Sequence, residues 1–395
     1  MPETLQLYYL EPRLLETDAT IVDVRGQGSS PEIVLDRTLF YPEGGGQPCD
    51  LGTLGGAALS SVVEVGGRIV HRLAGPLEAR PGQRVRLVLD GGRRRDHREQ
   101  HSAQHLLSSV LLRLFDAPTV SFHLGAERST IDAEAPLLSD EDLAEAEGQI
   151  DEVVAEDYPF TTHLCPPEDP DSFPLRKRPP QGEEELRIVE IDGIDYSPCC
   201  GTHVSSAGEL RLVKILGAEK YKGMTRVSFV AGARAIRDYA EVSHIVRQTA
   251  RAFGVSSSEL EEKARRSVER LKSAEASLVA LRRDRAALEA RIAAGPSGAP
   301  PSPSLLRFAD RDAQAAQEAV HAYGELGATA LAASLPELTV VAGSPDARDL
   351  GRRLKALAEP LGGKGGGGQG SFRASFPDLA SLETFLDKAR AELGG

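Results

Sequence analysis

The spacing of apolar residues predicts a strand-rich first part of the chain. Short runs over 20–24, 32–36 and 85–89 are rich in β-branched residues or alternate between apolar and polar positions, which favours strands. Two further runs flank a Gly66-Gly67 turn, a pattern typical of a β-hairpin. Residues 1–90 are therefore expected to form a small β-barrel-like domain.

The next part combines helices with strands. Apolar residues recur with helical spacing around 107–114, and a strand pair is expected over 119–133. A second helix is predicted over 140–156, followed by an irregular proline-rich passage over 159–180. Residues 91–236 thus predict an α/β core in which helices pack against an antiparallel sheet.

Helices dominate the following segment, 237–294. Apolar periodicity predicts one helix over 235–253 and a longer one from about 260 to 292. The longer helix has a heptad seam at Leu260, Ala264, Ser267, Leu271, Ala274, Leu278, Leu281, Arg285, Leu288 and Ile292. The seam predicts either a packed helical hairpin within one chain or a dimeric coiled coil.

A change of composition marks the end of this segment. Residues 295–304 are rich in Gly, Pro and Ser, as in a linker. Beyond them we expect a helix over 313–326, a strand over 338–341 and a helix opened by Ser344-Pro345. A glycine-rich run, a short strand and a last helix complete residues 305–395 as a small α/β domain. The whole chain is expected to be of the α+β class.

Length, charge and cysteine content narrow the class of protein. A chain of 395 residues is expected to hold two or three domains. The sequence has no apolar run near the ~18 residues that a membrane span needs, so we expect no membrane contact. Its four cysteines do not suggest a disulfide framework, and we expect a cytoplasmic protein. The net charge of −13 disfavours broad binding to a polyanion. Cations nevertheless gather at Lys214, Lys220, Lys222 and Arg226.

Two short stretches carry residues that bind transition metals. His101 and His105 are four residues apart in a predicted helix, so both side chains can face one ion. A strand over 186–191 is expected to lead to Cys199 and His203, which are also four residues apart. One thiolate and three imidazoles suit the tetrahedral coordination of Zn²⁺. The sequence therefore predicts one metal site.

Spacing alone leaves the choice of ligands open at two places. His97 stands four residues before His101 and extends the same stripe, so the helical pair could be His97 and His101. Cys200 adjoins Cys199 and competes with it for the position of the thiolate.

The same stretches resemble a known family. The motifs are His-Ser-Ala-Gln-His-Leu-Leu at 101–107, Cys-x-Gly-Thr-His-Val at 199–204, and the glycine-rich Phe-Tyr-Pro-Glu-Gly-Gly-Gly-Gln-Pro at 40–48. In this order they resemble the editing domain of alanyl-tRNA synthetases and, more closely, the long form of the free-standing AlaX proteins. The resemblance spans roughly residues 5–240. It implies the zinc ligands His101, His105, Cys199 and His203.

The resemblance also implies a function. AlaX proteins hydrolyse mischarged alanine tRNA, so the chain is expected to be an ATP-independent, zinc-dependent aminoacyl-tRNA hydrolase that serves translation fidelity. Seryl-tRNA(Ala) is the expected substrate, with glycyl-tRNA(Ala) as the other candidate. The sequence has no segment resembling the ATP-binding domain of a synthetase, which argues against a complete alanyl-tRNA synthetase. The alternative is a tRNA-binding protein with a structural zinc and no hydrolytic activity.

By the same resemblance, the glycine-rich turn forms a wall of the amino-acid pocket. A site that hydrogen-bonds a substrate hydroxyl rejects an analogue that lacks it. Thr38 is therefore expected to favour removal of serine over alanine. The expected pocket residues are Thr38, Glu43, Gly45, Gly46, Gln47, Gln104, Asp195 and Thr202.

Residues 305–395 resemble the DHH-associated domain at the C-terminus of alanyl-tRNA synthetases, over a shorter and less specific match. This resemblance implies contact with tRNA and a homodimer formed through the helical and C-terminal segments. Lys364, within the glycine-rich run, is expected to contact an RNA phosphate. A merely flexible loop is the alternative interpretation of that run. The other expected tRNA contacts are Lys214, Lys220, Lys222 and Arg226.

Overall fold

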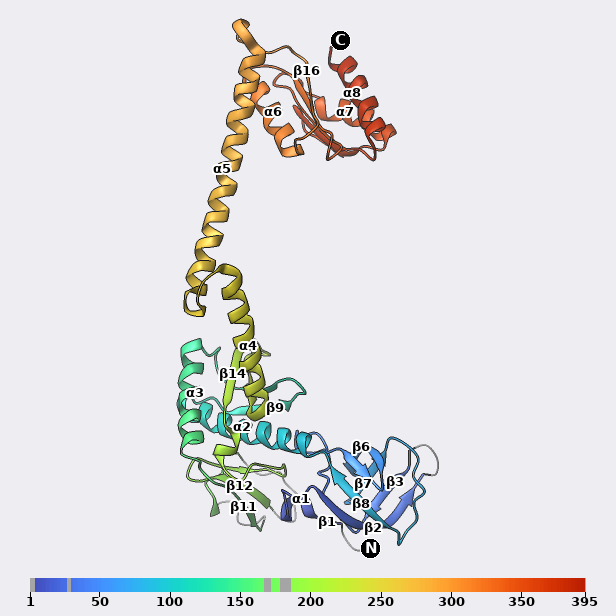
Figure 1. Cartoon of the computed structure of the whole chain (residues 1–395), viewed down its shortest axis with the longest axis vertical. Helices are drawn as coiled ribbons and strands as arrows, with labels where there is room; N and C mark the ends of the chain where they lie inside the picture. Colours follow the sequence, from blue (N-terminus) through green and yellow to red (C-terminus); the bar gives the residue numbers. More distant parts are fainter. Residues whose placement is uncertain (1–3, 27–29, 167–171, 178–185, 395) are drawn as a thin grey trace. The chain divides into compact units, whose positions relative to one another are not determined.

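A computed structural model describes residues 4–26, 30–166, 172–177 and 186–394. The chain divides into two compact units, Met1–Val246 and Arg247–Gly395. Each unit has its own buried core, and the mixture of helices with several sheets confirms that the chain combines both kinds of element (Figure 1).

Six antiparallel-paired strands of the first unit close into a barrel in the order β2-β3-β7-β6-β5-β8. The predicted hairpin is present, because Glu64 pairs with Ile69 across the Gly66-Gly67 turn. A short parallel pair, β1 (Leu5–Gln6) with β4 (Arg37–Thr38), and the helical turn α1 (Leu7–Leu10) accompany the barrel. The barrel strands are β2 (Glu16–Arg25), β3 (Glu32–Leu35), β5 (Gly52–Leu54), β6 (Ala57–Glu64), β7 (Ile69–Leu73) and β8 (Arg84–Leu89).

The remainder of the first unit is built around α2 (Gly91–Phe115), which runs from the barrel toward α3 (Asp140–Ala155) (Figure 1). A capping box at Ser139 opens α3. Apolar residues of α2, including Leu106 and Val110, are fully buried against a four-stranded sheet in the order β14-β15-β10-β9. The sheet comprises β9 (Thr119–Leu124), β10 (Ser129–Ala133), β14 (Val213–Tyr221) and β15 (Met224–Ala231).

A second, three-stranded sheet corrects the expectation of an irregular passage over 159–180. There β11 (Phe160–Cys165) pairs in full register with β12 (Leu186–Ile191). Cys199 also follows a further strand, β13 (Asp195–Pro198), and not β12 directly. The neighbouring prolines and acidic residues obscured the strand pattern in the sequence. Residues 167–171 and 178–185 of the predicted passage lie outside the described residues.

After the 3-10 turn η2 (Ala207–Leu210) and the hairpin β14–β15, helix α4 (Gly232–Phe253) follows, as its apolar pattern predicted. The boundary between the two units falls within this helix. Among the described residues, no helix combines the length and the apolar character that a bilayer crossing requires.

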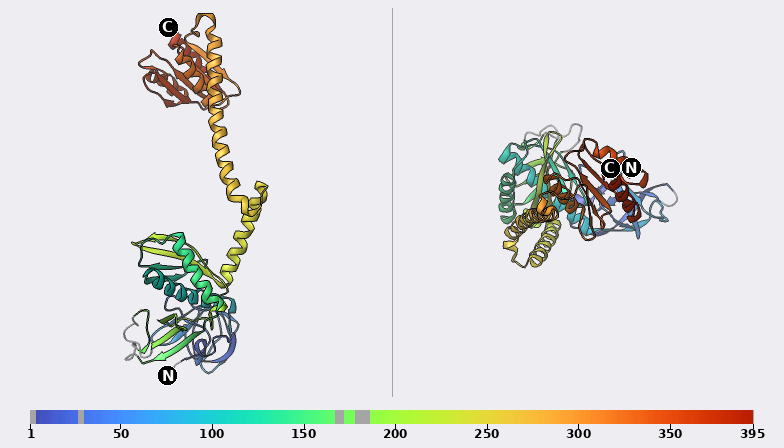
Figure 2. Two further views of the ribbon diagram at one scale, coloured as in Figure 1. Left: turned by 90° about the vertical axis from the view of Figure 1, so that its left-hand side faces the viewer. Right: turned by 90° about the horizontal axis from the view of Figure 1, so that it is seen from above.

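The second unit contains α5 (Leu260–Ala294) and a five-stranded sheet in the order β16-β17-β18-β20-β19. In the left view of Figure 2, α5 is one continuous helix, and the sheet and its helices lie beside its C-terminal half. The remaining elements are η3 (Ser257–Glu259), η4 (Gly295–Ser297), β16 (Ser304–Phe308), α6 (Ala313–Glu325), β17 (Ala330–Ser334), β18 (Thr339–Gly343), α7 (Leu350–Ala358), η5 (Glu359–Leu361), β19 (Lys364–Gly366), β20 (Ser371–Ser375) and α8 (Leu379–Gly394).

Two features of this unit differ from the sequence prediction, and a third speaks against the flexible-loop alternative for the glycine-rich run. Strands β16 and β17 were not expected, and α7 begins at Leu350 instead of directly after Ser344-Pro345. The glycine-rich run is not merely a loop, because β19 pairs with β20. A Cβ on Gly365 would stand 2.1 Å from the carbonyl oxygen of Arg373, so the close approach of these two strands requires glycine there.

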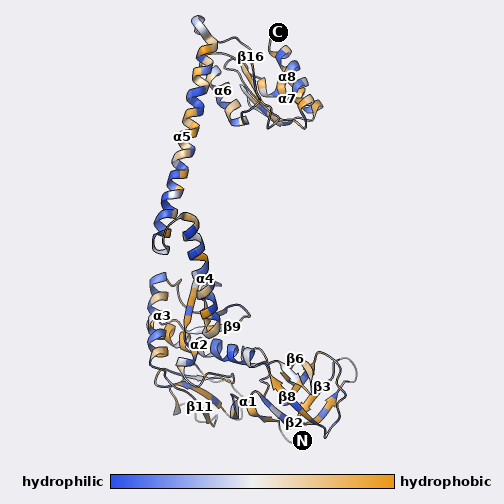
Figure 3. Cartoon of the chain, viewed as in Figure 1, coloured by the Kyte–Doolittle hydropathy of each residue, from blue (hydrophilic) through white to orange (hydrophobic). Residues whose placement is uncertain are grey.

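The leucine seam of α5 is not the face that packs in this unit. Ala286 and Ala290 are buried against α6 and the sheet, together with Tyr323. The seam residues Leu281 and Ile292 are 66% and 71% exposed. Apolar positions along α5 alternate with hydrophilic ones in Figure 3.

Candidate metal centre

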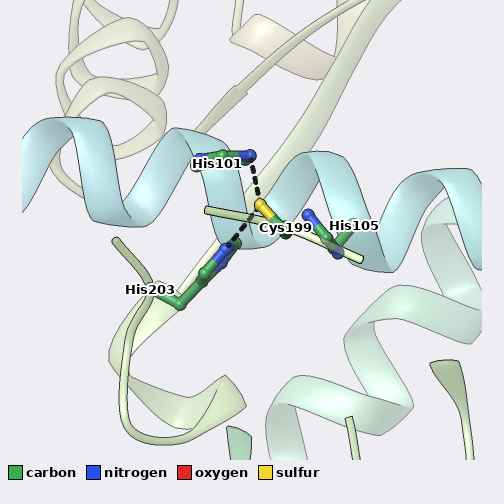
Figure 4. Close-up of side chains that lie close together, drawn as sticks. All are labelled: His101, His105, Cys199 and His203. Carbon is green, nitrogen blue, oxygen red and sulfur yellow. Dashed lines mark hydrogen bonds between the residues drawn. The ribbon is translucent and has the colours of Figure 1, made fainter. Parts of the chain in front are cut away.

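The four residues predicted as metal ligands lie together. His101 and His105 come from α2, and Cys199 and His203 come from the loop that follows β13 (Figure 4). One ligand atom from each residue lies within 4.8 Å of the other three. The sulfur of Cys199 is 3.4 Å from Nε2 of His101 and 3.4 Å from Nε2 of His203. This group could bind a metal ion.

The two alternatives left open by spacing are not part of this group. His97 and Cys200 are absent from the cluster of donors found in the described residues. His97 is nevertheless buried on the same helix, and burial, with a contribution from Arg93, lowers its pKa to about 4.

Backbone and long-range contacts hold the loop against α2. Asp90 caps α2 by accepting a hydrogen bond from the backbone N–H of Arg93. Arg98 of the same helix donates to the carbonyl of His203 at 2.6 Å. Arg187, from β12, donates to the carbonyls of Cys199 and Gly201 at 2.7 and 2.9 Å. Guanidinium groups from two different elements, α2 and β12, therefore position the loop.

Gln47 connects the glycine-rich turn to the cluster. Its Oε1 is 2.9 Å from Nδ1 of His101 and accepts the backbone N–H of Thr202 at 3.0 Å. Its Nε2 donates to Oγ1 of Thr202 at 2.9 Å. Because a carboxamide oxygen only accepts, Nδ1 of His101 is the donor, which leaves the lone pair of its Nε2 directed at the cluster.

The other two histidines have similar neighbours. Nδ1 of His203 is 3.1 Å from Oγ of Ser102, which also accepts the backbone N–H of Val204. Nδ1 of His105 is 3.5 Å from Oδ2 of Asp195. Asp195 is itself held by Arg176, whose Nε donates at 2.7 Å. Such outer partners orient the imidazoles of metal sites in general.

The electrostatics of the cluster also fit zinc. Burial acts to raise the pKa of the Cys199 thiol, but the three surrounding imidazoles together hold that pKa well below its ordinary value. Burial lowers the pKa of His203 well below its usual range. A thiolate next to a neutral imidazole is a donor set that zinc prefers. Burial also acts to lower the pKa of His105, but Cys199 and Asp195 together raise it.

Two glycines permit close packing at the cluster. A Cβ on Gly201 would lie 2.2 Å from Cε1 of His101 and 2.9 Å from Oε1 of Gln47. Gly46, with φ of +81°, leaves space for the ring of Phe122, which its Cβ would approach to 2.7 Å. The ring of Phe122 lies 5.4 Å from that of His101. The glycine-rich turn therefore touches the wall of the site.

The remaining predicted pocket residues are placed differently. Thr38, the last residue of β4, is fully buried beside the barrel and is 2.8 Å from Nε2 of His71 in β7, whose Nδ1 lies 3.0 Å from a backbone carbonyl. Because that Nδ1 must donate, Nε2 accepts the hydroxyl proton of Thr38. Glu43 and Gly45 are exposed. Gln104 donates to Ser108, one turn further along α2.

The cationic residues predicted to contact tRNA fall into two groups. Lys214 forms an ion pair with Glu147, and Arg226 forms one with Asp132. Lys220, Lys222 and Lys364 are exposed and form no ion pair within the described part of the chain. Of the five predicted cations, these three lysines are therefore the ones whose charge is not paired with a carboxylate of the described residues.

Several residues of the site were not anticipated. They are Ser102, which contacts His203; Arg98 and Arg187, which hold the loop; Arg176, which holds Asp195; and Gly201. The sequence offered a signal only for Ser102 and Gly201, which lie inside the two motifs.

Comparison with known proteins shows what one segment of the site is similar to. Residues 186–228 match a family model described as the second additional domain of threonyl and alanyl tRNA synthetases. This segment begins with β12 and includes Cys199 and His203, two of the four clustered residues.

Individual relatives also bear names that refer to alanine tRNA. The chain is 36% identical over 250 residues to the alanyl-tRNA editing protein AlaX-L of Pyrococcus horikoshii, and the match covers 60% of each protein. It is 37% identical over 220 residues to the alanyl-tRNA editing protein Aarsd1 of Danio rerio, covering 55% of this chain and 53% of the relative. It is 31% identical over 310 residues to the alanine–tRNA ligase of Methanopyrus kandleri, covering 75% of this chain and 33% of the ligase.

These matches confirm the resemblance to alanyl-tRNA editing proteins that the motifs indicated. The chain spans 60% or less of the length of these editing-protein relatives.

Proposed function

We propose that this chain hydrolyses the ester bond between serine and mischarged alanine tRNA, without ATP. The observation that carries the proposal is the cluster of one thiolate and three imidazoles tied to the glycine-rich turn through Gln47. The names of the relatives, which are alanyl-tRNA editing proteins, support the same activity. Glycine on alanine tRNA is the second candidate substrate.

The residues have distinct roles in this proposal. His101, His105, Cys199 and His203 would hold zinc, which when bound would polarise the ester carbonyl or orient the terminal ribose. Gln47 keeps His101 in one tautomer and joins the turn to the loop at Thr202. The exposed glycines of the turn allow backbone amides to approach the substrate closely. Lys220, Lys222 and Lys364 are the candidate contacts to the tRNA backbone.

The test is release of labelled amino acid from alanine tRNA charged separately with serine, glycine or alanine. With zinc-loaded full chain, we expect rapid release of serine and little release of alanine. The rate with glycine decides whether the pocket selects the hydroxyl or only small size. Absence of release from all three tRNAs, in folded metal-loaded protein, would refute the proposal.

Substitution of the clustered residues tests the site itself. His101→Ala and Cys199→Ala should lose bound metal and lower the rate of serine release by more than the roughly 10–100-fold that loss of an outer partner costs. Metal content and single-turnover release are measured on the same samples. The matched controls are the exposed His123→Ala and the adjacent Cys200→Ala, which lie outside the cluster and should retain both properties.

One observation favours a second candidate function. Four protein donors complete a tetrahedral site and leave no open position, which is typical of structural zinc. In that case the chain is a tRNA-binding protein without hydrolytic activity. Removal of metal with a chelator distinguishes the two. A structural zinc predicts unfolding of the first unit on chelation, whereas the editing proposal predicts a folded chain that no longer releases serine.

A further inference from the structure

A second concavity of the first unit lies beside the candidate metal centre. It has a volume of about 630 Å³ and is lined by the first half of α2, by the β9–β10 turn and by the start of α4. None of the four clustered residues lines it. Pro48 and His97 do, and each adjoins the metal centre, because Pro48 follows Gln47 and His97 lies one helical turn before His101. We call this concavity the arginine cleft.

The arginine cleft is positively charged, although the chain as a whole carries −13. Arg93, Arg95, Arg234 and Arg237 line it, together with only two carboxylates.

Both carboxylates of the cleft already have partners. Asp96 accepts two hydrogen bonds from Arg234, at 2.7 and 2.5 Å. Glu99 accepts from Arg211 at 2.8 Å and from the backbone N–H of Ala233 at 2.9 Å. These four contacts satisfy the acidic groups inside the protein. The negative charge of the cleft is therefore neutralised before any ligand arrives.

Two arginines of the cleft keep their charge available. Arg95 and Arg237 are exposed, and neither forms an ion pair within the residues that the structure describes. They come from different helices, α2 and α4, and line the same cavity. A guanidinium presents planar hydrogen-bond donors that match the oxygens of a phosphate group.

A buried polar atom independently indicates a missing partner. His97 is only 4% exposed, and its Nδ1 is buried without a hydrogen-bond partner among the described residues. Leaving such an atom unsatisfied costs stability, so native proteins rarely do it without a reason. Because His97 lines the cleft, a bound ligand would supply the partner that the protein does not if the ring turns its Nδ1 toward the cleft.

We propose that the arginine cleft binds backbone phosphates of the acceptor end of the tRNA whose terminal ester enters the metal centre. This inference rests on the proposed editing function. Arg95 and Arg237 would contact phosphate oxygens, and His97 would hydrogen-bond to the same stretch of backbone. Contacts of this kind position a nucleic acid without reading its sequence. They explain how a chain of net negative charge can still engage RNA, through a local cluster of cations.

The experiment compares two substrates that share the same ester. One is seryl-tRNA(Ala), and the other is 2′(3′)-O-seryl-adenosine, which has no phosphodiester. For Arg95→Glu and Arg237→Glu in the zinc-loaded full chain, kcat/KM on the tRNA should fall roughly tenfold or more relative to kcat/KM on the nucleoside ester. The slope of log kcat/KM for the tRNA against the logarithm of the salt concentration should become shallower by about one unit for each arginine replaced.

A matched control carries the same charge change outside the cleft. Arg80 is exposed, lies in the turn before β8 and forms no ion pair within the described residues. Arg80→Glu should leave the ratio of the two kcat/KM values within about twofold of that of the unsubstituted chain, because its charge lies outside the cleft. A drop as large as that in Arg95→Glu would mean that net charge, and not the cleft, controls tRNA use, and would overturn the proposal.

His97 gives a test that does not depend on added charge. His97→Leu keeps a buried side chain but removes the unsatisfied nitrogen, so the free energy of unfolding should stay equal or rise. KM for seryl-tRNA(Ala) should rise as well, and KM for seryl-adenosine should not. A purely structural role predicts the reverse, with lower stability and equal loss on both substrates.

Failure of the cleft and failure of the editing function are distinguishable. If the unsubstituted chain cleaves neither ester, the editing function is refuted, and binding of uncharged alanine tRNA still tests the cleft through the same variants. If it cleaves both and the arginine variants lose nothing on tRNA, the cleft proposal is refuted. Equal loss on both substrates refutes it too, since the arginines then support the fold of the core.

Discussion

Each histidine of the candidate metal centre has its Nδ1 next to a different polar group. The neighbours are Gln47 for His101, Ser102 for His203 and Asp195 for His105. All three Nε2 atoms remain for the cluster. Gln47 was predicted to contact the substrate, but its carboxamide oxygen is occupied by His101 and Thr202. We therefore assign Gln47 a positioning role and leave substrate contact as a prediction.

Gly201 is the residue whose substitution should disturb the site most directly. In Gly201→Ala, the new Cβ would stand 2.2 Å from the ring of His101, so either the ring or the loop must move. We expect unfolding free energy to fall by about 1–3 kcal/mol, as for other overpacked positions. Metal affinity should fall by roughly 10–100-fold, since the orientation of His101 is lost. Urea unfolding and competition with a metal chelator measure the two effects.

The control for this substitution is Gly148→Ala. Gly148 lies in α3 with open space around it and an ordinary helical backbone. Alanine there should stabilise the chain by about 0.5–1 kcal/mol because helical glycine is entropically costly. Equal metal affinity in Gly201→Ala and the parent chain would contradict the geometry described for the loop.

His71 should make stability depend on pH. Burial lowers its pKa to about 4, and its hydrogen bonds to Thr38 and a carbonyl use the neutral ring. The unfolded chain, with a pKa near ~6.5, therefore binds this proton more readily than the folded chain. The contribution is complete above about pH 6.5, and it is lost as the pH falls toward about 4. Its full size is on the order of 3 kcal/mol.

The measurement is the free energy of unfolding in urea between about pH 6.5 and pH 5, above the range where most carboxyls titrate. In His71→Gln, the slope of the unfolding free energy against pH should decrease by an amount that corresponds to at most one bound proton. His244→Gln, a change at an exposed histidine of α4, should leave the slope unchanged. An unaltered slope in His71→Gln would show that His71 does not titrate in this way.

The sequence predicted the four clustered residues better than their surroundings. Each pair of ligands is separated by four residues, so local spacing and motif recognition were sufficient. The supporting contacts join distant parts of the chain, such as Ser102 with Val204 and Arg98 with His203. Nothing in a single sequence relates such pairs. Thr38 illustrates the limit, because its burial and its contact with His71 depend on how β4 packs against the distant strand β7.

At the scale of elements, long periodic segments were predicted well and short strands were not. The helices α3, α4 and α5 were expected within a few residues of their ends. The sequence of β17, Ala-Leu-Ala-Ala-Ser, consists mainly of helix-favouring residues, yet all five side chains are buried in the sheet. Its pairing with β16 and β18 overrides that local preference.

The alanine face of α5 is the packing surface that sequence analysis overlooked in favour of leucines. Ala290 is fully buried, and Ala293 is exposed on the same helix. Ala290→Leu should lower the unfolding free energy of the second unit by about 1–3 kcal/mol because it overfills the contact with α6. Ala293→Leu makes the same chemical change and should stay within about 0.5 kcal/mol of the parent chain.

Thermal unfolding of both variants provides the comparison. Identical midpoints for the two would mean that the alanine face does not pack as described. A larger loss in Ala293→Leu would place the contact on the other side of the helix.

For the whole molecule, the resemblance to known proteins extends beyond the first unit. The match to the alanine–tRNA ligase covers 75% of the chain, which is more residues than the 246 of the first unit. Part of the second unit is therefore included. The second unit also carries Lys364, one of the exposed candidate tRNA contacts. The contribution of the second unit to function stays a prediction. The division of the chain into residues 1–90, 91–236, 237–294, 295–304 and 305–395 also stays a prediction.

The exposed seam of α5 favours a homodimer in solution. Leu271, Leu278, Leu281, Leu288 and Ile292 are between 50% and 71% exposed and repeat with heptad spacing. Because α5 packs on α6 through its alanines, this seam is left for a partner helix. The intramolecular hairpin was the other prediction. An exposed seam in a monomer would leave a long apolar stripe in water, which is costly.

The test places charge on the seam and, as a control, on the opposite face. Leu271→Glu with Leu278→Glu should raise the dimer dissociation constant at least ~100-fold, or about 2.8 kcal/mol. Ser273→Glu with Ala280→Glu shifts both charges by two residues, to exposed positions away from the seam, and should change that constant little. Sedimentation equilibrium over a range of concentrations measures both variants. A parent chain that stays monomeric at every concentration would refute the coiled coil. An equal rise of the dimer dissociation constant in both double variants would mean that added charge, and not the seam, controls association.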